Sequence, residues 1–143
     1  MTPDTPALSY AFEIRAEVDK PLHIGHGTTG ERTEFTPITG GTVRGPRLSG
    51  TVLPGGGDWS STRGDVCELE ARYLLRADDG AVIDIVNRGY YVESSGYFRT
   101  APVFRTDSPA HLWLARTVFV GHAHDEGNPR DGVAIVIRCY SVD

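Results

Sequence analysis

The fold of this chain is decided by the stretch from Asp65 to Asp79, DVCELEARYLLRADD, the longest run without glycine or proline. Even here, where a helix has most room, the apolar and charged residues alternate. One face carries Cys67, Leu69, Ala71, Tyr73 and Leu75, and the other carries Glu68, Glu70, Arg72 and Arg76. A period of two is typical of a β-strand with one buried face. The stretch is therefore predicted to be a strand.

The N-terminal stretch from Leu8 to Val18 alternates in the same way. Its pattern predicts that Leu8, Tyr10, Phe12 and Ile14 point inward while Glu13 and Arg15 are exposed. Seventeen glycines and nine prolines interrupt the chain, so no helix longer than two or three turns is expected. Further extended segments are predicted at residues 32–38, 42–52, 81–88, 90–92, 97–106, 112–121 and 133–142.

Turn sequences separate these segments. Asp78-Asp79-Gly80 is a hairpin signal, and Asn128 to Gly132 is a longer turn of the same kind. Successive hairpins predict an all-β, up-and-down antiparallel sheet of eight or nine strands. Closure into a barrel would remove its exposed edges, and a β-sandwich is the alternative. The length suits one domain over residues 1–143.

Composition narrows the classes of function. A formal net charge of -5 without a basic cluster argues against nucleic-acid binding. The N-terminus has no basic segment followed by an apolar run, and no stretch has the length of a membrane span. A cytoplasmic protein without membrane contact is expected. Cys67 and Cys139 fall on apolar faces, which suits small buried residues in a reducing compartment.

Several ordered blocks in the chain resemble one family. They are Pro37 to Gly41, Gly45-Pro46, Leu48 to Gly50, Val52 to Trp59, Glu70 to Tyr73, Asp78 to Ala81, Pro102 to Phe104 and Leu112 to Leu114. This order resembles the DUF3237 (UPF0311) family. The resemblance implies a lipocalin-like or allene-oxide-cyclase-like barrel, in a family where most members have no established biochemical role.

The chain also departs from the family pattern. Arg105 stands where an acidic residue usually follows the phenylalanine, and His111 and Ala115 flank the Leu-Trp-Leu block where Tyr and Asn are more usual. If that acid lines the family's cavity, the departure predicts altered cavity chemistry, shifted toward an anionic ligand.

Asp58 and Trp59 follow three glycines, where the backbone can approach a ligand closely. A carboxyl group against an indole can have a raised pKa and act as a general acid or base. In the alternative interpretation, Asp58 caps backbone amides in a turn and Trp59 plugs the barrel end.

Glu70 and Arg72 share one strand face, and Tyr73 lies on the other. If this face points inward, the guanidinium group of Arg72, held in place by Glu70, would bind an enolate or a carboxylate group of a ligand. Facing outward, which the more apolar opposite face favours, the pair forms a solvated ladder and Tyr73 becomes an inward polar group. Arg32 precedes the glycine-rich block and either overhangs the same mouth or is an exposed loop residue.

The histidines raise the question of a metal. His23 and His26 are three apart, and His122 and His124 two apart. Two such pairs can close a site, but both lie beside glycines in apparent loops, where solvated histidines are normal. We therefore predict no metal, and the glycines before Asp58 lack the Lys-Ser/Thr and helix of a phosphate loop.

Together these features predict a small-molecule site at the barrel mouth. The favoured hypothesis is a cofactor-independent isomerase, cyclase or lyase that moves a proton on a hydrophobic, carbonyl-bearing substrate. The alternatives are a non-catalytic binding or carrier protein, and a homo-oligomeric structural module with a filled barrel. In this hypothesis Asp58 is the general acid or base. An oxyanion is bound by Tyr73 with either Arg72, which Glu70 holds in place, or Arg32. The apolar walls of the site are formed by Trp59 and Trp113.

Overall fold

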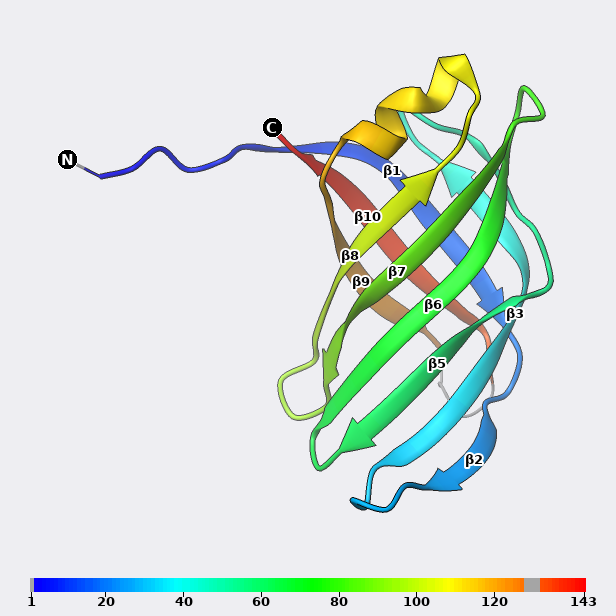
Figure 1. Cartoon of the computed structure of the whole chain (residues 1–143), viewed down its shortest axis with the longest axis vertical. Coiled ribbons are helices and arrows are strands. Elements are labelled where there is room, and N and C mark those ends of the chain that lie inside the picture. Colours follow the sequence, from blue (N-terminus) through cyan, green and yellow to red (C-terminus); the bar gives the residue numbers. More distant parts are fainter. Residues whose placement is uncertain (1, 128–131) are drawn as a thin grey trace.

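The computed structural model describes residues 2–127 and 132–143. Ten strands and one 3₁₀ helix follow one another along the chain in these ranges (Figure 1). They are β1 (Leu8–Val18), β2 (Leu22–His26), β3 (Arg32–Arg44), β4 (Gly50–Val52), β5 (Gly56–Arg63), β6 (Val66–Ala77), β7 (Val82–Val92), β8 (Tyr97–Arg105), η1 (Pro109–Arg116), β9 (Phe119–Glu126) and β10 (Ala134–Val142). The turn predicted from Asn128 to Gly132 falls largely outside the described residues.

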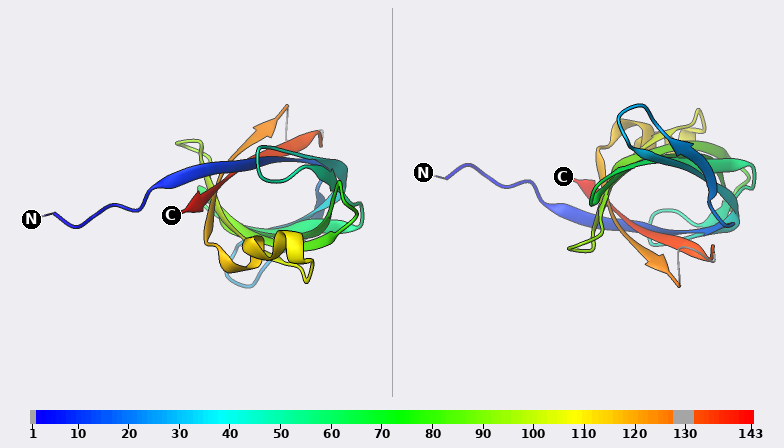
Figure 2. Two further views of the ribbon diagram at one scale, coloured as in Figure 1. Left: turned by 90° about the horizontal axis from the view of Figure 1, so that it is seen from above. Right: turned by 90° about the horizontal axis from the view of Figure 1, so that it is seen from below.

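Eight strands close into an antiparallel barrel, which confirms the predicted fold (Figure 2). The ring runs β1-β3-β5-β6-β7-β8-β9-β10, and β1 closes it by pairing with both β3 and β10. The two additional strands are short: β2 pairs with β3, and β4 bridges β3 and β6. Within the described residues, no helix has the length and apolar character needed to span a membrane.

The N-terminal alternation predicted the register only in part. Phe12 and Ile14 are fully buried, but Leu8 and Tyr10 are 55% and 42% exposed, so their predicted inward positions are wrong. The pairing of β1 with β10 shifts between Tyr10 and Phe12. An irregularity of this kind breaks the period of two and lets the strand turn. The chain before Ala11 consequently lies outside the packed interior, as Figure 1 shows.

The strand predicted at residues 112–121 is also wrong in its first half. Residues Pro109–Arg116 form η1, and β9 begins only at Phe119. Proline fits the first turn of a helix, and a short apolar run does not distinguish a helix from a strand by periodicity alone. Leu114 in η1 is almost completely buried, at the end of the barrel that is uppermost in Figure 1.

The third departure concerns β5 (Gly56–Arg63), because the sequence pattern predicted no strand there and the alternative interpretation placed these glycines in a turn. Gly56 and Gly57 instead belong to the strand. A Cβ atom on Gly56 would lie 2.4 Å from the carbonyl oxygen of Arg72, and one on Gly57 would lie 2.2 Å from the ring of Phe35. These glycines therefore let β5 lie close to its neighbours, and Asp58 follows them within the strand.

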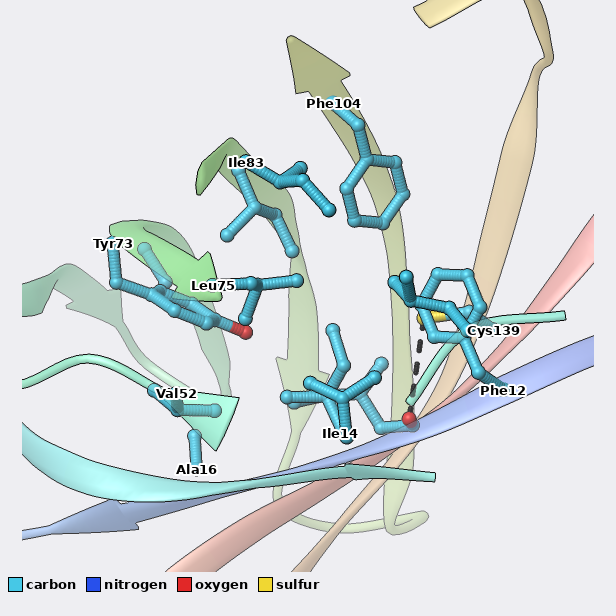
Figure 3. Packing of buried hydrophobic residues seen from close by; sticks show 14 of the residues in the cluster. Phe12, Ile14, Ala16, Val52, Tyr73, Leu75, Ile83, Phe104 and Cys139 are labelled. Atoms are coloured by element: carbon cyan, nitrogen blue, oxygen red, sulfur yellow. Dashed lines mark hydrogen bonds between the residues drawn. The ribbon is translucent and has the colours of Figure 1, made fainter. Parts of the chain in front are cut away.

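The two halves of the barrel differ in their filling. The half nearer η1, which is the upper half in Figure 1, is packed with aromatic and aliphatic side chains. They include Phe12 and Phe104, which Figure 3 labels, and Phe119. The ring centroids of Phe104 and Phe119 lie 5.1 Å apart and those of Phe12 and Phe104 5.6 Å apart, in edge-on geometry. Such pairs add about 0.5–1.5 kcal/mol each beyond the area they bury. The open space is in the lower half.

Candidate functional site

The lower half of the barrel encloses a cavity of about 150 Å³. Its wall is mostly apolar, and it reaches the lower end near Pro21, Cys67 and Tyr91. A cavity of about this volume holds a benzene-sized molecule, whereas sites for drug-sized ligands are at least about twice as large. The enclosed part therefore fits a single ring or a short branched chain.

Strand register arranges the wall in layers. Residues paired across β5, β6, β7 and β8 lie side by side in rows, which form the layers of the wall, and the side chains that point inward alternate along each strand. From the packed interior to the mouth, the layers are Tyr73 with Ile85; Asp58 with Ala71 and Asn87; Ser60 with Leu69 and Thr100; and Cys67 with Tyr91 and Phe98.

Asp58 faces this cavity from β5. Burial raises the pKa of its carboxyl group to about 6, and the nearby Asp125 carboxylate also raises this pKa, while the backbone N–H of Glu70 donates a hydrogen bond that partly offsets the rise. Among the described residues, the buried Oδ1 of Asp58 has no hydrogen-bond partner. A carboxyl group with these properties exchanges protons near neutral pH.

Tyr73 lies one layer deeper and projects into the interior (Figure 3). It is 3% exposed, and no described residue hydrogen-bonds to its hydroxyl oxygen. Burial raises the pKa of this phenol above its ordinary value, and the ionised Asp58 carboxylate acts in the same direction. Tyr73 therefore stays protonated at neutral pH and can donate a hydrogen bond.

Asn87 and Thr100 complete the polar part of the wall. Asn87 is 3% exposed and Thr100 is 6% exposed, and within the described chain their Oδ1 and Oγ1 atoms have no hydrogen-bond partner. Sequence reasoning missed both residues. Each is a polar residue at an inward position of an alternating strand, beside Ile85 on β7 and Phe98 on β8, and this signal could have identified them.

Asp125 and Cys67 are further titratable groups in the lining of the cavity. Asp125 on β9 is half-buried, and burial raises the pKa of its carboxyl group. Cys67 lies near the mouth, and burial raises the pKa of its thiol, which therefore remains protonated. Two carboxyl groups, Asp58 and Asp125, thus face one small space.

Comparison with known proteins agrees with the family resemblance that the sequence blocks indicated. A family model described as "Protein of unknown function (DUF3237)" matches residues 6–96 and 91–142. This chain belongs to the DUF3237 family.

Relatives in this family agree in sequence and structure. A UPF0311 protein of Clostridium acetobutylicum is 43% identical over 126 residues, which cover 76% of this chain and 80% of that protein. The crystal structure of a conserved protein of unknown function from Rhodopseudomonas palustris superposes with a TM-score of 0.89 at 34% identity, covering 99% of this chain and 100% of that one. A hydroalkoxylation enzyme of Penicillium herquei is 32% identical over 115 residues, covering 78% of this chain and 70% of the enzyme.

In this DUF3237 barrel, Trp59 does not face the cavity that Asp58 lines. It is 54% exposed on the outer surface, where its ring centroid lies 4.5 Å from that of Phe35. Consecutive residues of a strand point to opposite faces. The expected contact between the acid and the indole therefore does not form, and burial in the cavity accounts for the raised pKa of Asp58 instead.

Arg72 and Glu70 also face outward, so the favoured exterior arrangement is the one observed. Arg72 pairs with Asp84 at 3.2 Å, and Glu70 pairs with Arg88 at 3.1 Å. These are cross-strand pairs with largely exposed guanidinium groups, and such pairs contribute about 0–1 kcal/mol. Neither side chain reaches the cavity.

Arg32 and Trp113 are likewise separate from the cavity. Arg32 begins β3, is exposed and lies 3.5 Å from Glu34. Trp113 belongs to η1 at the opposite end, where it packs beside Phe12 and the Arg47 guanidinium lies 3.7 Å from its ring centroid. Of the seven candidate residues, the structure brings together only Asp58 and Tyr73 in the cavity.

The residues that depart from the family pattern lie elsewhere too. Arg105 ends β8 with an exposed side chain, so its predicted effect on the cavity is wrong. His111 on η1 contacts Asp79 in the β6–β7 turn at 2.8 Å.

The histidine pairs lie on the surface. His23 and His26 on β2 and His122 and His124 on β9 are exposed. The described residues contain no group of three or more His, Cys, Asp and Glu side chains placed to hold a metal ion.

Proposed function

We propose that this chain is a cofactor-independent enzyme of the isomerase, cyclase or lyase type, which transfers a proton on a small carbonyl-bearing or hydroxyl-bearing molecule inside the barrel. One observation carries the proposal: a mostly buried carboxyl group with a pKa of about 6, Asp58, shares a cavity with the hydroxyl group of Tyr73. A general base works best when its pKa lies near the working pH.

The proposed mechanism uses these two groups. The ionised Asp58 carboxylate removes a proton from the carbon next to the substrate's carbonyl group. The electron pair of the broken C–H bond forms a carbon–carbon double bond, and the π pair of the carbonyl bond moves onto the carbonyl oxygen. The hydroxyl of Tyr73 donates a hydrogen bond to this oxygen, whose negative charge is stabilised more strongly in a dry site than in water. In a substrate with a carbon–carbon double bond next to the deprotonated carbon, the intermediate is a dienolate. Protonated Asp58 then returns the proton to the far carbon of that double bond, the carbonyl group re-forms, and the double bond shifts into conjugation, which completes an isomerisation.

The relative in Penicillium herquei supports acid–base chemistry in this family. Hydroalkoxylation adds an O–H group across a carbon–carbon double bond: the O–H bond and the π bond break, a C–O bond forms at one carbon and a C–H bond at the other, and no external oxidant or reductant is needed. Such a reaction requires a base for the hydroxyl and an acid for the carbon. Asp58 provides both forms in one catalytic cycle, because its pKa lies close to neutral pH.

The test is deuterium incorporation. Small cyclic ketones and ortho-alkenyl phenols are incubated with the protein in D₂O and EDTA, and NMR follows exchange of their carbon-bound protons. We expect exchange with the wild type and its loss with Asp58→Asn, which keeps the shape of the side chain. Glu68→Gln is the matched control, because it changes an exposed acid on the adjacent strand β6.

A carrier protein gives a different result. It would bind members of the panel without exchange, and Asp58→Asn would leave that binding in place. Undiminished exchange in Asp58→Asn would likewise refute the proposal, because the carboxylate would then be dispensable.

A further inference from the structure

Four polar atoms without partners lie on one wall of the cavity. They are Asp58 Oδ1, Tyr73 OH, Asn87 Oδ1 and Thr100 Oγ1, from the four consecutive strands β5 to β8, and they lack hydrogen bonds to the described residues. Buried polar atoms without partners are uncommon because each loses its hydration without compensation. Their concentration on one wall indicates the polar side of a binding site.

The proton-transfer mechanism leaves two members of this group unused, Thr100 on β8 and Asn87 on β7, and Asn87 is the one that lies fewer strands away from Asp58. It lies in the same layer as Asp58, with Ala71 between them. The backbones of Asp58 and Asn87 are two strand spacings apart, which is about 10 Å in total. The small side chain of Ala71 leaves the space between them open. A carboxamide offers two N–H donors and one carbonyl acceptor, so it can bind both a hydroxyl group and the oxyanion derived from it.

We infer that Asn87 and Tyr73 form an oxygen-binding subsite, and that the substrate is a molecule with a phenol-sized ring whose hydroxyl or enol oxygen lies between them. The inference rests on the proposed function and names its substrate class. The Oδ1 atom of Asn87 accepts a hydrogen bond from the hydroxyl, and its amide N–H or the Tyr73 hydroxyl donates to the oxygen. The ring then lies beside Asp58.

The size and lining of the cavity determine the rest of the substrate. Its volume of about 150 Å³ accepts one six-membered ring. Leu69, Phe98 and Ile137 provide apolar contacts for the ring. Substituents extend toward the lower end, between Tyr91 and Pro21, because the packed upper half leaves no room for them.

Phenol and toluene test this inference, because they have nearly the same shape and differ in the hydroxyl group. A site built to hydrogen-bond a hydroxyl rejects an analogue without it. We expect the wild type to bind phenol at least tenfold more tightly than toluene in an NMR titration. Asn87→Leu should reduce this preference to less than about threefold, since it replaces the amide with an apolar group of similar size.

Two further variants complete the design. Tyr73→Phe removes only a hydroxyl group, so it tests the same subsite if Asn87→Leu fails to fold, and it should also weaken the preference by several-fold. Ser141→Ala is the matched control, because Ser141 is 2% exposed but hydrogen-bonds to Ser9 and Asp143 outside the cavity. It should keep the wild-type preference.

The outcomes separate this inference from the proposed function. Equal binding of phenol and toluene by the wild type, or a full preference retained by both Asn87→Leu and Tyr73→Phe, would overturn the subsite. Deuterium exchange by the wild type would in that case still support the proton-transfer enzyme. A preference that depends on Asn87 together with no exchange would support the subsite and overturn the enzyme.

Discussion

Replacing Asp58 with Asn should stabilise the protein at neutral pH. The pKa of this carboxyl group rises from its ordinary 3.8 to about 6 in the folded chain. Above pH 6 the folded protein holds an ionised carboxylate in a mostly apolar cavity, at a cost that the unfolded chain does not have. At 1.36 kcal/mol per pKa unit, the difference corresponds to about 3 kcal/mol. Asparagine is neutral at every pH and avoids this cost.

The sign of the effect fixes its pH dependence. Between pH 3.8 and about 6 the folded state binds the proton more tightly than the unfolded state, so the stability of the wild type falls as pH rises through this window. The advantage of Asp58→Asn is therefore largest above pH 6. It should decrease from about 3 kcal/mol near pH 7.5 to below about 1 kcal/mol near pH 4.

Urea denaturation of both proteins at these two pH values measures the effect, provided that the denaturant slope is unchanged. Glu68→Gln should alter the free energy of unfolding by less than about 0.5 kcal/mol at either pH, because its side chain is exposed. A less stable Asp58→Asn protein near pH 7.5, or a difference between the variants that does not depend on pH, would show that the carboxylate is not destabilised by burial.

Three other changes test the site and its support. Asp125→Asn should move the midpoint of the pH–exchange profile to lower pH, because the lost negative charge had raised the pKa of Asp58; an unmoved midpoint would contradict this coupling. Ala71→Leu should fill the open layer and weaken phenol binding at least tenfold, with the melting temperature within a few degrees of the wild type; undiminished binding would place phenol elsewhere. Gly56→Ala should lower the free energy of unfolding in urea by about 3 kcal/mol or more, since its Cβ atom would lie 2.4 Å from the Arg72 carbonyl oxygen. A near-neutral result would show that β5 can shift.

Part of the candidate site follows from alternation along single strands. On β6 the apolar face of the pattern identified Tyr73 as an inward polar residue and placed Arg72 outside, and both positions are observed. The same reading applied to β7 and β8 would have found Asn87 and Thr100. Asp58 was singled out for its glycines and its neighbouring indole, although the reason for its raised pKa proved different.

Local sequence determined that this chain forms alternating antiparallel strands, because a period of two, frequent glycine and proline, and hairpin turns leave no long helix. Tertiary structure decided between a barrel and a sandwich, through the pairing of β1 with both β3 and β10. Tertiary structure decided which side of β5 holds Asp58. Gly56 and Gly57, which the alternative interpretation placed in a turn, are strand residues, because β3 and β6 pair with β5 on both sides of them. Tertiary structure also decided that Asp58, Tyr73, Asn87 and Thr100 share one cavity. The register between strands sets which residues lie side by side, and no single strand encodes that register.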